Sequence, residues 1–185
     1  MRRREVVRFL GAALALPFLP RGAEAAIKLG ESLHARLGEG DVPFRTLNAA
    51  QQALVTNIAE LIIPETDTPG ATRVKVPEFI DLILTEWAST EERDAFLAGL
   101  ADIDARAATM GQTRFVDLPP ARKTELLTAL DAASKDKSGA GLAFARLKAL
   151  TVYGYFTSMP VQQDILKTQM FFNGYDGNVP FTPAV

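Results

Sequence analysis

The sequence contains no cysteine and only one histidine, His34, and these absences exclude several kinds of redox centre. Without cysteine there can be no disulfide, no thiolate zinc site, no cysteine-ligated iron–sulfur cluster and no C-x-x-C-H haem attachment. A single histidine also excludes a bis-histidine haem within one chain. His34 lies in a stretch rich in glycine and charge, and we predict a solvated side chain on a short helix or linker.

Patterns typical of enzymes are also missing. No G-x-G-x-x-G follows a predicted strand, so the chain does not encode a Rossmann-type FAD site. The acidic pairs Glu91-Glu92 and Asp102-Asp104 are most simply solvated helix faces. A small helical hydrolase would need two carboxyl groups facing each other across a cleft, and the sequence shows no such pair.

The composition is that of an ordinary globular protein, with 48% hydrophobic and 23% charged residues among 185. This length suits one domain with a real core. The formal net charge of −2 conceals a basic start, because residues 1–25 hold five arginines and two glutamates. The remaining chain is acidic, which gives no electrostatic footprint for nucleic acid.

Residues 1–25, MRRREVVRFLGAALALPFLPRGAEA, predict an export signal, with a basic start, an apolar run over residues 9–19 and a small-x-small triplet at residues 23–25. The apolar run is about half the length of a bilayer-spanning helix, so a membrane anchor is the less favoured interpretation. Arg3 and Arg4, followed by Glu-Val-Val-Arg, resemble the twin-arginine signal. A general secretory signal is the alternative. The twin-arginine route carries already folded proteins across the membrane into the periplasm.

The rest of the chain predicts an all-α fold. Residues 26–45 read as a lead-in segment in which glycines weaken any helix, and the helical domain spans residues 46–185. Apolar residues recur there at helical spacing, without alternating strand runs or internal repeats. We therefore predict a compact bundle of about five to six helices with an irregular C-terminal tail. The predicted apolar stripes are Leu47/Leu54/Ile58/Leu61, Phe79/Ile80/Ile83/Leu84/Trp87, Phe96/Leu97/Leu100/Ile103 and Leu126/Leu127/Leu130, and the most apolar helix, at residues 142–158, is expected at the centre.

Local signals mark several helix ends. Asn48 and Gln51 resemble a capping box, because each side chain can bond the other residue's backbone N–H. Pro64 ends the predicted helix that contains Leu54 and Ile58. Gly111 is a candidate C-cap for the predicted helix that contains Phe96 and Leu100. Pro77 suits the first turn of the helix that follows the loop, where its missing N–H costs nothing.

The loop PETDTPGA, residues 64–71, joins two apolar helices and contains good turn residues. Asp67 can bond backbone N–H groups two residues on, Pro69 fixes the backbone, and Gly70 permits a positive φ. A corner between helices is a sufficient explanation of this loop. Contact with a partner protein is the alternative.

The tail MFFNGYDGNVPFTPAV, residues 170–185, combines aromatic side chains with turn-forming dipeptides. Its aromatic residues could fold back and complete the core of the same domain. They could equally form a surface for a partner. The sequence leaves both interpretations open for Phe171, Phe172, Tyr175 and Phe181.

The order of these pieces resembles the gluconate 2-dehydrogenase subunit 3 family, the small subunit of membrane-associated, flavin-dependent sugar dehydrogenases. Three segments carry the resemblance. They are LIIPETDTPGA followed by VPEFIDLIL, then RFVDLPPARKTELLTALD, and finally YGYFTSMP with FFNGYDGNVPF.

The resemblance implies a non-catalytic accessory subunit that holds no cofactor of its own. A larger flavoprotein of the glucose-methanol-choline oxidoreductase type would hold FAD and oxidise the sugar or polyol. A multihaem cytochrome c, with haem c, would be a third subunit in some complexes. The small subunit would supply the export signal and aid maturation of the flavoprotein, and the complex would be periplasmic, with membrane association through its other subunits.

A complex that crosses the membrane already assembled needs a broad interface, on the order of 2,000 Å² or more with an apolar centre. Aromatic residues dominate the hot spots of such interfaces. A stand-alone periplasmic helical binding protein, with a ligand pocket between helices, is the alternative from another class. The candidate interface residues are Pro64, Asp67, Pro69 and Gly70 in the loop, then Tyr153, Tyr155 and Phe156, and then Phe171, Phe172, Tyr175 and Phe181.

Overall fold

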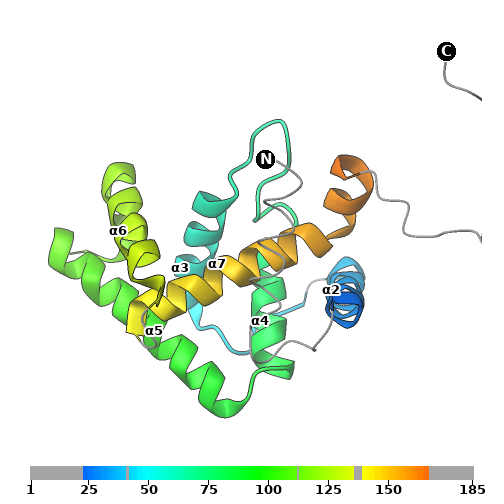
Figure 1. Cartoon of the computed structure of the whole chain (residues 1–185), viewed down its shortest axis with the longest axis horizontal. Coiled ribbons are helices and arrows are strands. Elements are labelled where there is room, and N and C mark those ends of the chain that lie inside the picture. The colour runs from blue at the N-terminus through cyan, green and yellow to red at the C-terminus, as the bar shows by residue number, and fades with distance from the viewer. Residues whose placement is uncertain (1–22, 41, 112, 136–138, 167–185) are drawn as a thin grey trace, which may run out of the picture.

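The computed structural model describes residues 23–40, 42–111, 113–135 and 139–166, and all regular structure within them is helical. The predicted all-α bundle is confirmed (Figure 1). Shorter helical turns are η1 (Phe115–Asp117), η2 (Ala133–Lys135) and η3 (Val161–Ile165). The α-helices are α2 (Ala23–Gly38), α3 (Ala49–Ile62), α4 (Val76–Glu86), α5 (Thr90–Gly111), α6 (Pro120–Ala132) and α7 (Gly139–Thr157).

Helix α7 runs through the middle of the molecule, and the other helices pack around it (Figure 1). It contacts each of α2, α3, α4, α5 and α6. Every residue from Thr151 to Thr157 is buried, as expected of a helix that is hydrophobic nearly all round. The prediction that the most apolar helix is central is therefore confirmed.

The helix ends of α3 and α4 follow their local signals. Asn48 Oδ1 accepts from the backbone N–H of Gln51 at 3.0 Å, and Gln51 Oε1 accepts from the N–H of Asn48 at 3.0 Å. This is the predicted capping box. Helix α3 ends two residues before Pro64, and Pro77 lies in the first turn of α4.

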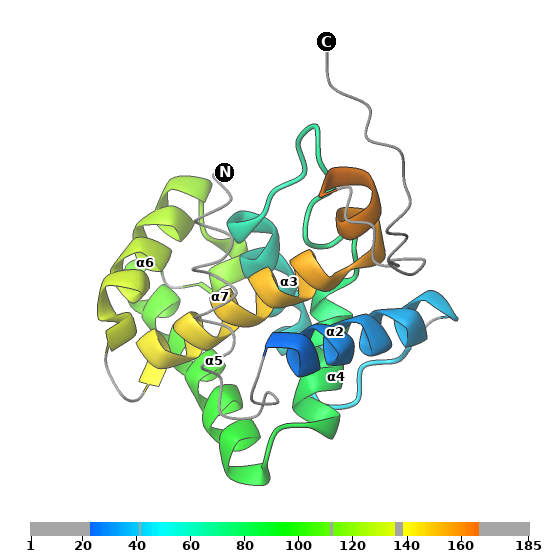
Figure 2. The same cartoon turned by 45° about the vertical axis from the view of Figure 1, so that its right-hand side comes forward.

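Helix α2 corrects the expectation that glycines weaken the lead-in segment. It is a continuous helix of 16 residues, and Figure 2 shows it lying across α4 and the C-terminal part of α7. A Cβ at Gly30 would lie 2.6 Å from Thr157 Cβ on α7, so this glycine permits close approach of the two helices. Its buried apolar residues are Ala26, Leu29, Leu33 and Leu37.

Two residues of the predicted stripes are not in the core. The Trp87 residue is 45% exposed, because α4 ends at Glu86 and the φ of −120° at Trp87 takes it out of the helical stripe. Leu61 is 41% exposed, in the last turn of α3. Helical spacing predicts a buried face only as far as the helix and its neighbours extend.

Asp104 is not the solvated acid that the sequence suggested. Its carboxylate is half-buried and accepts from the backbone N–H of Phe115 at 3.0 Å. This bond ties the turn that follows α5 back onto that helix. Phe115 is itself fully buried, so Asp104 positions a core residue.

Candidate partner interface

The loop at residues 64–71 is held at both ends by one carboxylate, that of Glu60 in the last turns of α3. Its Oε1 accepts from the N–H of Glu65 at 2.9 Å, and its Oε2 accepts from the N–H and the hydroxyl of Thr72 at 3.0 and 2.6 Å. Burial opposes ionisation of Glu60, but these hydrogen bonds outweigh it and hold its pKa below the usual value. The Glu60 carboxylate therefore joins the two ends of the loop through hydrogen bonds.

The φ of Gly70 is not positive, so glycine is not needed here for a left-handed backbone. It is needed because there is no room for a side chain. A Cβ at this position would collide with Oε1 of Glu60 and would lie 2.8 Å from the backbone nitrogen of Glu65. The predicted turn is confirmed, but the predicted role of Gly70 is wrong. Its missing side chain is what lets the loop close over the Glu60 carboxylate.

Asp67 also has a different role from the predicted one. The bond across the turn is made by Thr66, whose N–H donates to the carbonyl of Thr68 at 3.0 Å. The Asp67 carboxylate accepts from the Thr66 hydroxyl at 3.0 Å, and Asp67 is exposed at the tip of the loop. It is therefore free to face a partner without disturbing the backbone of the loop.

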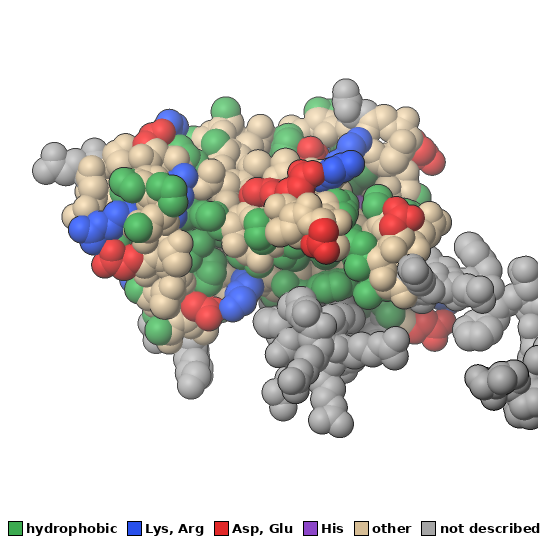
Figure 3. Space-filling view, turned by 90° about the horizontal axis from the view of Figure 1, so that it is seen from above, with side chains coloured by type: hydrophobic (Ala, Val, Ile, Leu, Met, Phe, Trp, Pro, Cys, Tyr) green, Lys and Arg blue, Asp and Glu red, His purple; other side chains and the backbone are tan. Residues whose placement is uncertain are grey.

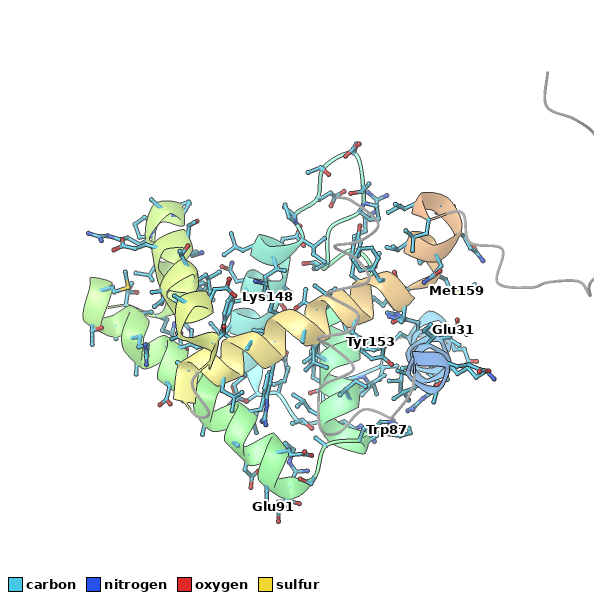
Figure 4. The ribbon with its side chains drawn as sticks, in the orientation of Figure 1. Glu31, Trp87, Glu91, Lys148, Tyr153 and Met159 are labelled. Atoms are coloured by element: carbon cyan, nitrogen blue, oxygen red, sulfur yellow. The ribbon has the colours of Figure 1, made fainter. Side chains whose placement is uncertain are left out.

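The aromatic candidates of α7 are largely enclosed by the chain itself. Tyr153 is 2% exposed, points from α7 toward α2 (Figure 4), and donates its hydroxyl hydrogen to the carbonyl of Ala26. Burial raises the pKa of this hydroxyl. Tyr155 donates to the carbonyl of Pro69 at 2.9 Å and so supports the loop, while its ring packs edge-on against Phe156. Tyr153 has no surface to offer a partner, which corrects its place among the interface candidates.

Tyr155 and Phe156 nevertheless line an open hollow of about 540 Å³ between the end of α3, the loop, α7 and η3. We call this hollow the apolar groove. Figure 3 looks down on this end of the molecule, where hydrophobic side chains are exposed between charged ones. The polar side chains in the groove are Thr66, Thr68 and Lys148. Its apolar lining includes Ile62, Ile63, Pro64, Val152, Ile165 and Leu166.

A second hollow, of about 400 Å³, lies against the same loop and has more charged side chains in its lining than the apolar groove has. It is lined by Glu65, Asp67, Arg73 and Asp164, and Arg73 Nη1 donates to Glu65 Oε1 at 2.7 Å. Within the described ranges no group of three or more His, Asp or Glu residues is arranged to hold a metal ion. The loop thus stands between an apolar and a charged depression, a surface suited to protein contact.

His34 is buried, which corrects the prediction of a solvated side chain. Its ring stacks on Phe79 with centroids 4.7 Å apart and planes 13° apart, and its Nε2 lies 2.7 Å from the carbonyl oxygen of Gly154. Because a carbonyl only accepts, Nε2 carries the hydrogen. Burial lowers the pKa of His34 to about 4, against the opposing effect of this hydrogen bond. The neutral imidazole joins α2 to α4 and α7.

Two carboxylates of α4, which the sequence did not single out, hold the segment that leads into α3. Asp81 is 2% exposed, and its oxygens accept from the N–H groups of Arg45, Thr46 and Leu47 at 2.8, 3.0 and 2.7 Å. Glu86 accepts two hydrogen bonds from Arg36 on α2, at 2.7 and 2.8 Å, and another from Arg45. The hydrogen bonds from Arg36 and Arg45 lower the pKa of Glu86 to about 2, while burial opposes this shift.

Several sequence-predicted residues lie outside the described ranges and stay predictions. They are the signal residues Arg3 and Arg4 and the tail aromatics Phe171, Phe172, Tyr175 and Phe181. Of the helices that the structure describes, none is long and apolar enough to cross a membrane.

These features define a class: a small all-α protein with a surface loop whose two ends are joined by one carboxylate, beside an apolar groove. Residues 49–174, more than half of the chain, match the family model described as gluconate 2-dehydrogenase subunit 3. The chain belongs to this family, as the sequence motifs predicted, and membership implies an accessory subunit of a dehydrogenase complex. Comparison with curated proteins and with solved structures gave no match.

Proposed function

We propose that this protein is the non-catalytic small subunit of a periplasmic, FAD-dependent sugar or polyol dehydrogenase. In this role it supplies the export signal and aids the maturation and stability of the flavoprotein subunit. The observation that carries the proposal is the family match over residues 49–174. In this proposal the FAD belongs to the partner, a flavoprotein of the glucose-methanol-choline type, and a multihaem cytochrome c is the candidate for a third subunit.

The attachment of α2 supports a role as an escort. This helix overlaps the end of the predicted signal and is built into the body by bonds to distant elements. The hydroxyl of Tyr153 binds the carbonyl of Ala26, the carbonyl of Gly154 binds His34, and Lys75 Nζ donates to the carbonyl of Leu37 at 2.9 Å. A signal joined to such a helix is attached to a folded domain. This arrangement suits the twin-arginine route, which exports folded proteins.

The surface around the loop supports a partner contact. The loop backbone is fixed by Glu60 below and Tyr155 beside it, so little conformational entropy remains to be lost on binding. The charged hollow on the other side of the loop, with Glu65, Arg73 and Asp164 in its lining, supplies groups that can pair with charges of a partner. Pro64, Asp67 and Pro69 are the candidates that this surface retains.

Export with the flavoprotein tests the proposal. We would co-express the full chain with the flavoprotein, replace Arg3 and Arg4 together by lysine, and measure flavin and dehydrogenase activity in the periplasm. The expected result is loss of both from the periplasm, while Arg2→Lys leaves them unchanged. Periplasmic flavoprotein that is independent of this subunit would overturn the proposal. A tagged pull-down with a flavin spectrum tests the complex directly.

A stand-alone binding protein remains the second candidate because the apolar groove, at about 540 Å³, falls within the size range of small-molecule sites. This reading predicts that the tagged chain purifies alone, without flavin, from its native periplasm. It also predicts that apolar ligands protect the chain from thermal unfolding. A yellow eluate with a second, larger chain would contradict it.

A further inference from the structure

We propose that residues 167–174 of this chain fold back into the apolar groove, with Phe171 and Phe172 as the inserted side chains. This proposal concerns the chain itself and does not depend on the function proposed above. It is carried by the position at which the described chain ends, the chemistry of the groove and the extent of the family match.

The described chain ends at the groove. Leu166, its last residue, lines the groove and is 40% exposed, and its N–H donates to the carbonyl of Val161 at 2.9 Å. The side chain of Gln162 donates to the carbonyl of Phe156, which fixes η3 against the end of α7. Five further residues span at most about 17 Å, so Phe171 is within reach of the groove without any rearrangement of η3.

The groove is chemically matched to neutral aromatic side chains. Ile62, Ile63 and Val152 contribute aliphatic walls, and Phe156 contributes a ring. Among the described residues that line the groove, Lys148 is the one charged side chain, and it is paired with Asp131 at 2.8 Å. Aromatic residues that enter such a site bury apolar area without stranding a charge. Residues 170–172, Met-Phe-Phe, are the nearest apolar run along the chain.

The family match covers the segment that we place in the groove. It runs to residue 174, eight residues beyond Leu166, and therefore includes Phe171 and Phe172 with the helices. It stops before Tyr175 and Phe181. We assign the first pair of aromatics to the groove and leave the second pair outside it.

Crosslinking in the full chain tests the proposal, because the natural sequence has no cysteine. We would introduce the pair Lys148→Cys and Asn173→Cys and measure its reaction with a short bismaleimide at low protein concentration. The control pair is Glu91→Cys and Asn173→Cys. Figure 4 shows Glu91 at the far end of α5, well away from Lys148. Removal of the exposed Lys148–Asp131 pair has little effect on folding.

The expected result is an intramolecular crosslink that forms at least about tenfold faster at position 148 than at position 91, because docking raises the local concentration. Equal rates for the two pairs would overturn the proposal. Crosslinks only between chains, or a preference for position 148 that appears only with the flavoprotein bound, would also overturn it. These outcomes assign the groove to a second copy or to the partner.

A second set of variants identifies the inserted residues. Adding Phe171→Ser and Phe172→Ser to the Lys148→Cys, Asn173→Cys chain should reduce the crosslinking rate to that of the control pair. Adding Phe181→Ser should leave the rate unchanged. An unchanged rate in the first variant, or the same loss in both, would overturn the assignment of Phe171 and Phe172.

Discussion

The ring of His34 on α2 lies nearly parallel to that of Phe79 on α4, with their centroids 4.7 Å apart. Tyr153 on α7 packs edge-on against Phe79, with the two ring centroids 5.3 Å apart. Three helices that are distant in sequence therefore meet at one aromatic cluster. The imidazole is part of the core, where its single donated hydrogen bond and its neutral state are both required.

Burial of neutral His34 predicts a stability that falls with acidification. Its folded pKa of about 4 is below the unfolded value of 6.5, so the unfolded chain binds the proton first. The contribution of neutral His34 to the free energy of unfolding is complete above pH 6.5 and is lost as the pH falls toward 4. We expect a loss of about 2 kcal/mol of unfolding free energy between pH 7 and pH 5.

Urea unfolding at the two pH values measures this loss. His34→Gln keeps an N–H donor but cannot titrate, so the variant should be less stable at pH 7 and lack most of the pH dependence. An equal pH dependence in the two proteins would show that His34 is not its source.

Gly154→Ala should destabilise the same cluster. A Cβ at Gly154 would lie 2.7 Å from Cδ1 of Phe79, whose ring is also packed against His34 and Tyr153. We expect a loss of about 1–3 kcal/mol, typical of overpacking. Gly38→Ala is the matched control, because nothing lies within 4 Å of its Cβ, and it should be neutral or slightly stabilising. Thermal unfolding of both variants provides the comparison.

Asp81→Asn should be strongly destabilising despite its nearly unchanged size. Three backbone N–H groups point at the carboxylate, and an amide replaces one acceptor oxygen by a donor. The unpaired buried groups should cost about 2–4 kcal/mol. Asp102→Asn, on the exposed side of α5, should change the unfolding free energy by less than about 0.5 kcal/mol. Similar effects of the two changes would disprove the role assigned to Asp81.

Glu60→Gln should loosen the 64–71 loop while leaving the core intact. The amide retains one acceptor oxygen, so it cannot hold Glu65 and Thr72 together as the carboxylate does. We expect cleavage of the loop by a non-specific protease to become several-fold faster, with a small change in the melting temperature. Glu65→Gln, which loses only the exposed pair with Arg73, should be cleaved at the natural rate.

The sequence predicted the features that depend on neighbours along the chain. Asn48 and Gln51 are three residues apart, so their capping box is visible in the letters alone. The apolar stripes of α4, α5 and α6 are visible for the same reason. Trp87 shows the limit, since the spacing that places it on the α4 stripe does not reveal that the helix ends one residue earlier.

Features that depend on distant partners were not predicted. The environment of His34 is set by Phe79 and Gly154, and no local pattern distinguishes it from a solvated histidine. Gly30 weakens an isolated helix, yet here it permits contact with Thr157. Glu60 carries no motif at all. Its acidic side chain in the last turn of α3, where the helix dipole disfavours it, was the one available signal of a special role.

The docking of α2 constrains how residues 1–25 could be removed if they are an export signal cleaved after the small-x-small triplet at residues 23–25. The bond after Ala25 lies within the first turn of the helix, and Ala26 is 1% exposed with its carbonyl bonded to Tyr153. Processing enzymes cut chain that is accessible and locally unfolded. Removal of residues 1–25 would therefore compete with the packing of this turn: a leader would be released before α2 settles against α7, or only when the first turn of α2 unwinds again.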